Sequence, residues 1–224
     1  MTSDVCLYIL SLTEVPKGWE EHLGLVAPRY REKSVGKAPL RPRLGEFGAG
    51  LLLACFLGVT SDEDLTLGQE GKLALANDPA THFNLSHDDS LAVLGVGQSK
   101  LGVDVEEIPV AYEERHNAAL RFALSPEQLA RVESSPDPAE SFARAWTMVE
   151  SVLKADGRGF SYPVRGGHLP EGYRTVVHAL TGQDGKRHML SLSVPADVEP
   201  RLTLVRLNIA DVVNQLERGR RTSL

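Results

Sequence analysis

The stretch of residues 101–107, Leu-Gly-Val-Asp-Val-Glu-Glu, constrains the fold more than any other part of the chain. Its alternation predicts a β-strand with Val103 and Val105 on one face and Asp104 and Glu106 on the other. Two carboxylates held side by side repel each other, so they need either a cation between them or contact with water. Oxygen ligands of this kind suit Mg²⁺ better than zinc. The acidic, solvent-exposed face of an edge strand has the same pattern, so this stretch alone leaves both interpretations open.

Composition limits the class of protein. The chain has 224 residues, enough for one large domain or two small ones, and its net charge of −6 disfavours a nucleic-acid-binding protein. Its two cysteines, Cys6 and Cys55, show no metal-ligand spacing and fit a reducing compartment. The longest apolar runs, such as residues 51–57, are too short to span a membrane, and the N-terminus lacks the positive charge of a secretory signal. We therefore expect a soluble, cytoplasmic protein that binds neither membrane nor nucleic acid.

Basic residues are concentrated in one part of this acidic chain. The cluster consists of Arg29, Arg31, Lys33, Lys37, Arg41 and Arg43. Such a cluster can bind phosphates or an acidic partner, although a solvated face has the same composition. Lys72, in a glycine-flanked turn, is a second candidate for contact with a nucleotide, with an ordinary surface lysine as the alternative.

Two long helices and several strands are predicted. Apolar spacing indicates one helix over residues 44–57 and another over residues 139–155, which ends at Gly157. On the second helix Glu150 and Lys154 share a face, as they also would in an ordinary helix-stabilising pair. Residues 83–87 and 91–96 read as strands, and a turn at residues 97–100 predicts that the second of them forms a hairpin with the acidic strand. His87 then lies a short loop away from the carboxylates.

The C-terminal part is predicted to contain three more strands and a helix. The strands are expected over residues 173–180, 188–194 and 202–207, and an amphipathic helix over residues 210–218. Each half of the chain therefore combines β-strands with one long helix. The order of elements indicates two α+β lobes of similar size, residues 1–101 and 102–224, which join near the acidic strand.

Three segments, taken together and in this order, resemble the signature of the 4′-phosphopantetheinyl transferase superfamily, in its long, surfactin-synthetase-activating type. They are Phe-Asn-Leu-Ser-His at residues 83–87, Gly-Val-Asp-Val-Glu at 102–106, and Trp-Thr-Met-Val-Glu-Ser-Val-Leu-Lys-Ala-Asp-Gly at 146–157. Residues 121–127 are similar to the linker that the family carries between its second and third motifs. The resemblance implies a pseudo-twofold pair of lobes, each a small antiparallel sheet packed with a long helix, and coenzyme A in the cleft between them.

The resemblance also implies a role for each candidate site residue. The N-terminal lobe would contact the nucleotide and 3′-phosphate of coenzyme A, and the C-terminal lobe would carry the metal-binding acids and the catalytic helix. The implied magnesium ligands are Asp104, Glu106 and Glu150. The implied catalytic residues are Glu150, Lys154 and His87. The implied coenzyme A contacts are Arg29, Arg31, Lys33, Arg41, Arg43, Lys72, Ser86, His87 and Lys154.

The activity implied is Mg²⁺-dependent transfer of the phosphopantetheine arm from coenzyme A to a serine of an acyl or peptidyl carrier protein, by a monomeric enzyme that releases 3′,5′-ADP. The chain departs from the family at Val149, where a lysine is usual, and at Leu73, where a proline is common. Val149 motivates an alternative, a non-catalytic relative that binds coenzyme A or a carrier protein. A third hypothesis is an α+β interaction protein whose acids are solvated.

Overall fold

The computed structural model describes residues 1–68, 71–164 and 166–222. In chain order, its elements are β1 (Thr2–Ser11), η1 (Trp19–Leu25), α1 (Pro28–Ser34), α2 (Leu40–Leu57), η2 (Asp62–Asp64), β2 (Leu65–Leu67), β3 (Leu73–Leu75), β4 (His82–His87), β5 (Leu91–Gly97), β6 (Gly102–Glu107), α3 (Glu114–Ala123), α4 (Pro126–Glu133), α5 (Pro138–Asp156), η3 (Gly159–Ser161), β7 (Tyr173–Thr181), β8 (Arg187–Pro195), β9 (Glu199–Asn208) and α6 (Ile209–Thr222).

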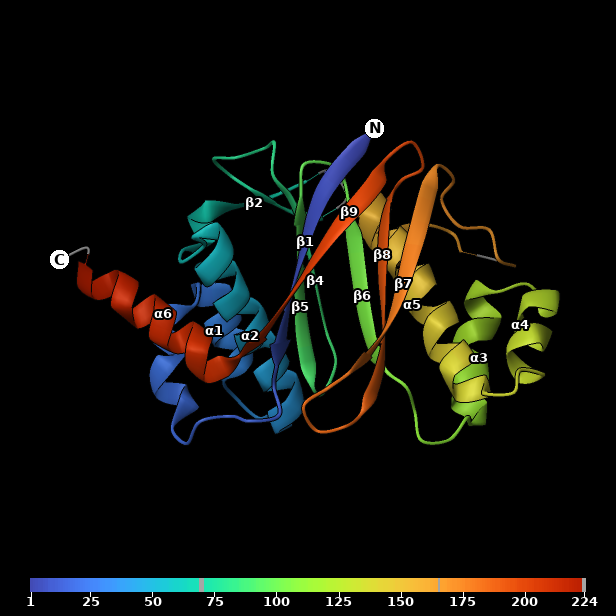
Figure 1. The fold of residues 1–224 in the computed structure, drawn as a ribbon, viewed down its shortest axis with the longest axis horizontal. Helices are drawn as coiled ribbons and strands as arrows, with labels where there is room; N and C mark the ends of the chain where they lie inside the picture. Colours follow the sequence, from blue (N-terminus) through green and yellow to red (C-terminus); the bar gives the residue numbers. More distant parts are fainter. Residues whose placement is uncertain (69–70, 165, 223–224) are drawn as a thin grey trace.

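Two sheets lie between two groups of helices (Figure 1). The first sheet has the strand order β4-β5-β1-β9, the second has the order β6-β8-β7, and β2 and β3 form a small separate pair. All strand pairs in the two larger sheets are antiparallel except β1 and β9, which run parallel. The long helix α2 accompanies the first sheet and the long helix α5 the second. The predicted α+β fold, with a small, mainly antiparallel sheet and a long helix in each half, is confirmed.

The predicted hairpin between residues 91–96 and the acidic strand is wrong. β5 pairs with β1 on one edge and with β4 on the other, so no edge remains free for β6. The chain instead crosses to the second sheet, where β6 pairs with β8 and Asp104 lies opposite Ser191. The acidic strand therefore begins the second sheet, at its edge, where one side of the strand is left open to neighbouring elements.

The last strand and helix return to the first sheet. β9 runs parallel to β1, with Thr2 opposite Glu199 and Ser11 opposite Asn208, and α6 then contacts α2. By sheet membership, residues 199–222 lie with the N-terminal lobe and not with the C-terminal one to which the sequence assigned them. β5 and β6 belong to different sheets, and the first sheet takes its strands from both ends of the chain.

A shared core fixes the direction of the acidic side chains. Val103 and Val105 of β6 are buried in one cluster with Leu7 of β1, Val93 of β5 and Leu190 of β8. This cluster joins the two sheets, so the valine face of β6 points into the core and the acidic face points away from it. Within the described part of the chain, none of the helices combines the length and apolarity needed to cross a membrane.

Candidate functional site

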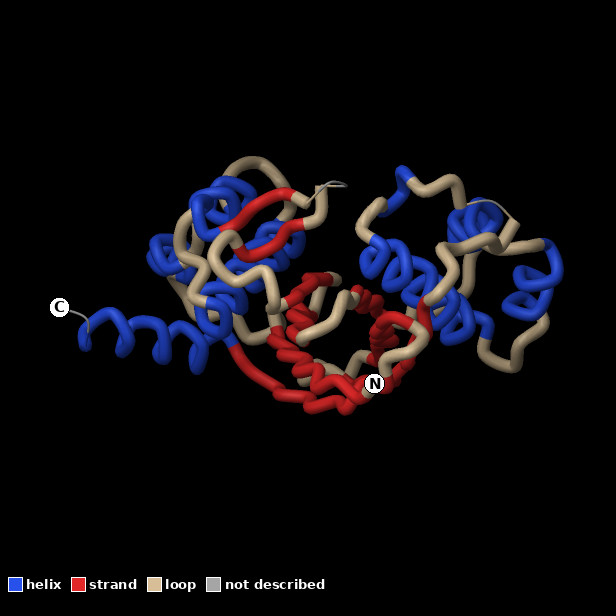
Figure 2. The backbone as a smooth tube through the Cα atoms, turned by 90° about the horizontal axis from the view of Figure 1, so that it is seen from above, coloured by secondary structure: helices blue, strands red, loops and turns tan. Residues whose placement is uncertain are grey.

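A pocket of about 490 Å³ lies where the two lobes meet. Figure 2 shows two groups of helices, one on each side of the strands. The residues that line the pocket come from α1, α2 and β4 of the first lobe and from β6 and α5 of the second. The polar and charged side chains that line it are Tyr30, Lys33, Glu46, Lys72, Asn84, Ser86, His87, Asp104, Glu106, Glu150, Lys154 and Arg158. Eight of the predicted site residues therefore share one pocket, although they come from separate parts of the chain.

A glycine allows β6 and α5 to touch. A Cβ atom at Gly102 would lie 2.1 Å from the carbonyl oxygen of Ser151 and 2.3 Å from the backbone nitrogen of Ala155. Only a residue without a side chain permits this approach of strand to helix backbone. The helix is also fixed on the second sheet, because the hydroxyl groups of Ser151 and Ser193 lie 2.8 Å apart. This contact brings the acidic strand beside the helix face that carries Glu150 and Lys154.

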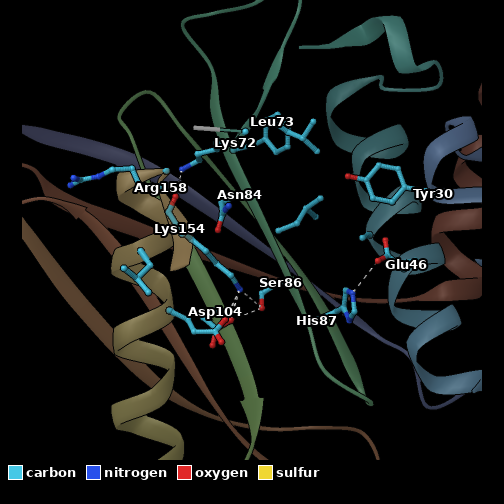
Figure 3. A pocket seen from close by; sticks show the side chains of 18 of the residues that line it. Tyr30, Glu46, Lys72, Leu73, Asn84, Ser86, His87, Asp104, Lys154 and Arg158 are labelled. Carbon is cyan, nitrogen blue, oxygen red and sulfur yellow. Dashed lines mark hydrogen bonds and ion pairs between the residues drawn. The ribbon is translucent and has the colours of Figure 1, made fainter. Parts of the chain in front are cut away.

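The side chain of Lys154 points toward Asp104 and Ser86 (Figure 3). Its ammonium group donates to Asp104 Oδ1 at 2.5 Å, and it lies 3.4 Å from Glu150 Oε2 and 3.1 Å from Ser86 Oγ. Asp104 is 2% exposed, and its second oxygen, Oδ2, is buried with no hydrogen-bond partner among the described residues. A buried carboxylate oxygen without a partner is costly, and it marks a position where the site can accept a further donor or a cation.

Burial and neighbouring negative charge raise the pKa of two of the acids, Asp104 and Glu106. Burial, followed by the charges of Asp104, Glu150 and Asp88, raises the pKa of Glu106 to about 8. Burial also raises the pKa of Asp104, against the opposing effect of Lys154. Burial of Lys154 works against its own charge, but Asp104 and Glu150 outweigh it and hold the pKa above its ordinary value. Among the described residues, Asp104, Glu106 and Glu150 therefore outnumber the ammonium group of Lys154 that lies beside them.

The three predicted metal ligands do not form a ready ligand set. Asp104, Glu106 and Glu150 line the same pocket, but the described residues contain no group of three or more His, Cys, Asp or Glu side chains placed to hold a metal ion. The ammonium of Lys154 instead lies between Asp104 and Glu150. The side chains are therefore brought together without being arranged as ligands.

β4 contributes two polar side chains to the same pocket. Ser86 Oγ donates to Asp104 Oδ1 at 2.7 Å. His87, at the end of the strand, occupies a space that Gly45 of α2 leaves open, because a Cβ atom there would lie 2.4 Å from the imidazole Nδ1. The imidazole Nε2 lies 4.0 Å from Glu46 Oε1, and burial lowers the pKa of His87. A neutral imidazole on the pocket wall can donate one N–H to a ligand.

The predicted basic residues divide into two groups. Lys33 lines the pocket, where its ammonium lies 3.2 Å from Glu46 Oε1. The guanidinium groups of Arg31, Arg41 and Arg43 donate to backbone carbonyl groups of the first lobe. The backbone N–H of Arg29 donates to Asp62. The geometry thus brings Lys33 to the other site residues and leaves the four arginines with contacts elsewhere in the N-terminal lobe.

Lys72 also lines the pocket, but its ammonium group is engaged by backbone. It donates to the carbonyl oxygen of Leu101 and to that of Lys154, both at 2.6 Å. Burial, together with the charge of Lys100, lowers the pKa of Lys72 to about 8.

The position of the unusual Val149 is clear. It is 1% exposed, and it packs in one buried cluster with Ala123 of α3, Leu153 of α5 and Val164. The valine therefore completes a hydrophobic core in this chain. The residue that departs from the family pattern, Val149, thus has a packing role within the C-terminal lobe.

Some pocket residues were not predicted. Asn84 Oδ1 accepts from the backbone N–H of Val103 at 2.8 Å and so joins β4 to β6. Its alternation with Ser86 along a strand is a signal that sequence reasoning could have used. The packing of distant elements brings three further residues to the pocket, Tyr30, Glu46 and Arg158. No local sequence pattern predicts their position there.

Comparison with known proteins finds a family model that matches the part of the chain carrying this site. Residues 100–182 match the family model of the 4′-phosphopantetheinyl transferase superfamily, and this range contains β6 and α5. The resemblance that the three motifs indicated, to this superfamily and to its surfactin-synthetase-activating type, is confirmed.

Individual relatives agree with that assignment. The chain is 28% identical to 4′-phosphopantetheinyl transferase Sfp of Bacillus subtilis over 106 residues, which cover 46% of each protein. It is 31% identical to 4′-phosphopantetheinyl transferase gsp of Aneurinibacillus migulanus, over 37% of this chain and 34% of the relative. It is 30% identical to 4′-phosphopantetheinyl transferase AcpT of Escherichia coli O157:H7, over 58% of this chain and 65% of the relative. In each case the match spans less than two thirds of the relative's own length.

Proposed function

We propose that this protein is a Mg²⁺-dependent 4′-phosphopantetheinyl transferase that moves the phosphopantetheine arm of coenzyme A to a serine of an acyl or peptidyl carrier protein. The observation that carries the proposal is the meeting of Asp104, Glu106 and Glu150 with Lys154 in one pocket between the lobes. Carboxylates surrounding a single ammonium suit a ligand that brings both a dication and an anionic pyrophosphate.

The donor atoms of these residues suit a magnesium ion, although their present arrangement would have to change to hold it. All three acids supply oxygen ligands, and Asp104 Oδ2 is a buried oxygen that lacks a partner among the residues described. The raised pKa of Glu106 reflects negative charge that a dication would compensate. Binding requires Lys154 to leave its present position between Asp104 and Glu150. When bound, Mg²⁺ supplies electrostatic stabilisation of the pyrophosphate as the phosphoanhydride bond opens.

The protein side chains have distinct tasks in this reaction. Lys154, once released from Asp104, would donate to the phosphate oxygens, and His87 and Ser86 would bind the pyrophosphate from the opposite wall. Lys33, at the end of the pocket near α2, would contact the phosphates of the nucleotide. Together they fix the phosphorus atom that bears the pantetheine arm and keep it accessible to the carrier protein.

Glu150 is the proposed general base. The serine Oγ of the carrier protein forms a bond to phosphorus, the bond from phosphorus to the bridging oxygen breaks, and 3′,5′-ADP leaves with the electron pair. The serine proton passes to the Glu150 carboxylate, which lies on the wall that also holds Asp104 and Lys154. We further propose that the monomer is the active form, because a single chain supplies both walls of the pocket. We also propose that it acts in the cytoplasm.

The alternative of a non-catalytic relative is not favoured. It was motivated by the absence of a lysine at position 149, but Val149 is buried in the core of the C-terminal lobe. The carboxylates and Lys154 are all retained in the pocket. The class of carrier protein, from fatty-acid, polyketide or non-ribosomal peptide synthesis, is left to the experiment below.

The test is labelling of a panel of apo carrier proteins with a fluorescent coenzyme A in the presence of Mg²⁺. We expect the wild type to label at least one carrier, and Glu150→Gln and Asp104→Ala to abolish labelling while circular dichroism shows an intact fold. A control variant, Glu133→Gln, changes an exposed acid of α4 and should label normally. Labelling that survives both site variants would rule out the proposed function.

A further inference from the structure

Lys72 makes an unusual contact between the lobes. It lies in the N-terminal lobe, directly before β3, and its ammonium group donates to the carbonyl oxygens of Leu101 and Lys154 at 2.6 Å each. Leu101 immediately precedes the acidic strand β6, and Lys154 lies in the last turn of α5. One side chain thus holds the beginning of the acidic strand and the end of the helix that carries Glu150.

The contact satisfies a need of the helix. The last four carbonyl groups of an α-helix have no partner within the helix, and they carry partial negative charge from the helix dipole. The carbonyl of Leu153 accepts from the N–H of Gly157, and the carbonyl of Lys154 accepts from Lys72. The hydrocarbon part of Lys72 packs beside Gly157, where a Cβ atom would lie 3.7 Å from Lys72 Cδ. Lys72 is therefore a cap supplied to α5 by the other lobe.

The surroundings of Lys72 are unlike a phosphate site. Two of its three N–H donors are used on carbonyl oxygens at short distance. Burial and the charge of Lys100 lower its pKa to about 8, against the opposing effect of Asp156. The residue capped by Lys72 is Lys154, whose own side chain neutralises Asp104. Movement of the last turn of α5 would therefore move the cation of the site.

We propose that Lys72 is a positioning residue, which ties the N-terminal lobe to the last turn of α5 and to the start of β6 and thereby holds Lys154 over the acids. It acts through Lys154 and does not bind the nucleotide phosphates. This inference concerns the unliganded protein, and its first test does not depend on the proposed transferase activity.

The first test is hydrogen exchange of the full chain without ligand, read by mass spectrometry. In Lys72→Met, we expect exchange in residues 153–157 to become about tenfold faster, because the helix end loses its cap. Lys72→Arg should restore slow exchange, since a guanidinium group can donate to two carbonyl groups. Lys100→Met removes a neighbouring exposed lysine and should change exchange there by less than twofold. If Lys72→Met does not fold, Lys72→Gln takes its place with the same criterion. Exchange that is equally slow in the wild type and in the variant would overturn the proposal.

The second test compares the affinities of coenzyme A and 3′-dephospho-coenzyme A for the wild type and for Lys72→Met. A positioning role predicts that both affinities fall by the same factor, within twofold. A loss confined to coenzyme A, tenfold or more, would mean that Lys72 binds the 3′-phosphate and would overturn the proposal. If the wild type binds neither compound, the proposed function fails, whereas the exchange experiment still decides the role of Lys72.

Discussion

The two walls of the pocket differ in chemistry and in construction. The C-terminal wall, formed by β6 and α5, carries Asp104, Glu106 and Glu150 around one lysine. The N-terminal wall, formed by α1, α2 and β4, presents hydrogen-bond donors, above all Lys33, Ser86 and His87, with Glu46 as its acid. An enzyme that splits a pyrophosphate needs both: one wall that accommodates a dication and a base, and one that donates to phosphate oxygens.

The walls also differ in how tightly they are built. On the C-terminal wall a glycine, Gly102, lies against the backbone of α5, so strand and helix are in direct contact. On the N-terminal wall Gly45 lies against the imidazole of His87, a side chain that can move. The comparison suggests that the acids occupy a rigid frame, whereas the phosphate-binding side can adjust. This difference can be tested directly.

The largest expected loss of activity comes from a variant of the C-terminal wall, which we compare with a variant of the N-terminal wall. Glu106→Gln should lower kcat/KM for transfer about 10³-fold, because it removes charge next to the reacting phosphate. Lys33→Met should lower it only about tenfold and mainly through KM, because this lysine is largely exposed and already paired with Glu46. Steady-state kinetics on one carrier protein gives both values. Equal losses of kcat/KM in the two variants would contradict the proposed difference in function between the two walls.

The second prediction concerns the two glycines. Gly102→Ala should destabilise the protein by about 3 kcal/mol, because its methyl group meets backbone that cannot move without separating β6 from α5. Gly45→Ala should change the unfolding free energy by less than about 1 kcal/mol, since His87 can shift and alanine favours the helix. Urea denaturation measures both. A Gly45→Ala variant as unstable as Gly102→Ala would contradict the idea of an adjustable wall.

The third prediction concerns pH. The pKa of Glu106 rises from 4.5 to about 8 on folding, so the folded state binds a proton that the unfolded state releases. This contribution to stability is present below pH 4.5 and is lost as the pH rises through 8. We expect the unfolding free energy of the Mg²⁺-free wild type to fall by about 2 kcal/mol between pH 5 and pH 9 relative to that of Glu106→Gln. This value is smaller than the full linkage because water reaches the side chain of Glu106.

Mg²⁺ should raise the Tm of the wild type more at pH 8 than at pH 6, because its ligands must be deprotonated.

The smallest effect is expected at Arg41. Its guanidinium group donates to the carbonyl oxygens of Leu12 and Asp89 in the N-terminal lobe. Arg41→Gln should therefore change the affinity for coenzyme A less than twofold, as measured by calorimetry. A tenfold loss would mean that this arginine leaves its carbonyl partners to bind the 3′-phosphate, as the family resemblance implies.

Local patterns predicted the C-terminal wall better than the N-terminal one. The alternation of residues 102–106 identified β6, and the spacing of Glu150 and Lys154 identified their common face on α5, because both signals lie within one element. The N-terminal wall depends on packing between distant elements. Tyr30 and Glu46 belong to different helices, and sequence spacing gives no sign that they reach the same pocket.

The errors have the same origin. The hairpin between β5 and β6 was predicted from a short turn, but β5 has both edges occupied by β4 and β1. The return of β9 to β1 joins residues about two hundred positions apart, and no turn or periodicity encodes that pairing. The prediction that Lys72 contacts a nucleotide is not among these errors and stays a prediction, but the contacts of its ammonium group with two backbone carbonyl groups could not be inferred from its loop.

The central claim is that the acids of the C-terminal wall serve phosphopantetheine transfer. It is tested most directly by mass spectrometry of apo carrier proteins incubated with the wild type, coenzyme A and Mg²⁺. The account predicts that the mass of one phosphopantetheine group is added at the carrier serine, that 3′,5′-ADP appears in equal amount, and that chelation of Mg²⁺ prevents both. Unchanged carriers across representatives of all three biosynthetic classes, despite measurable binding of coenzyme A, would contradict it.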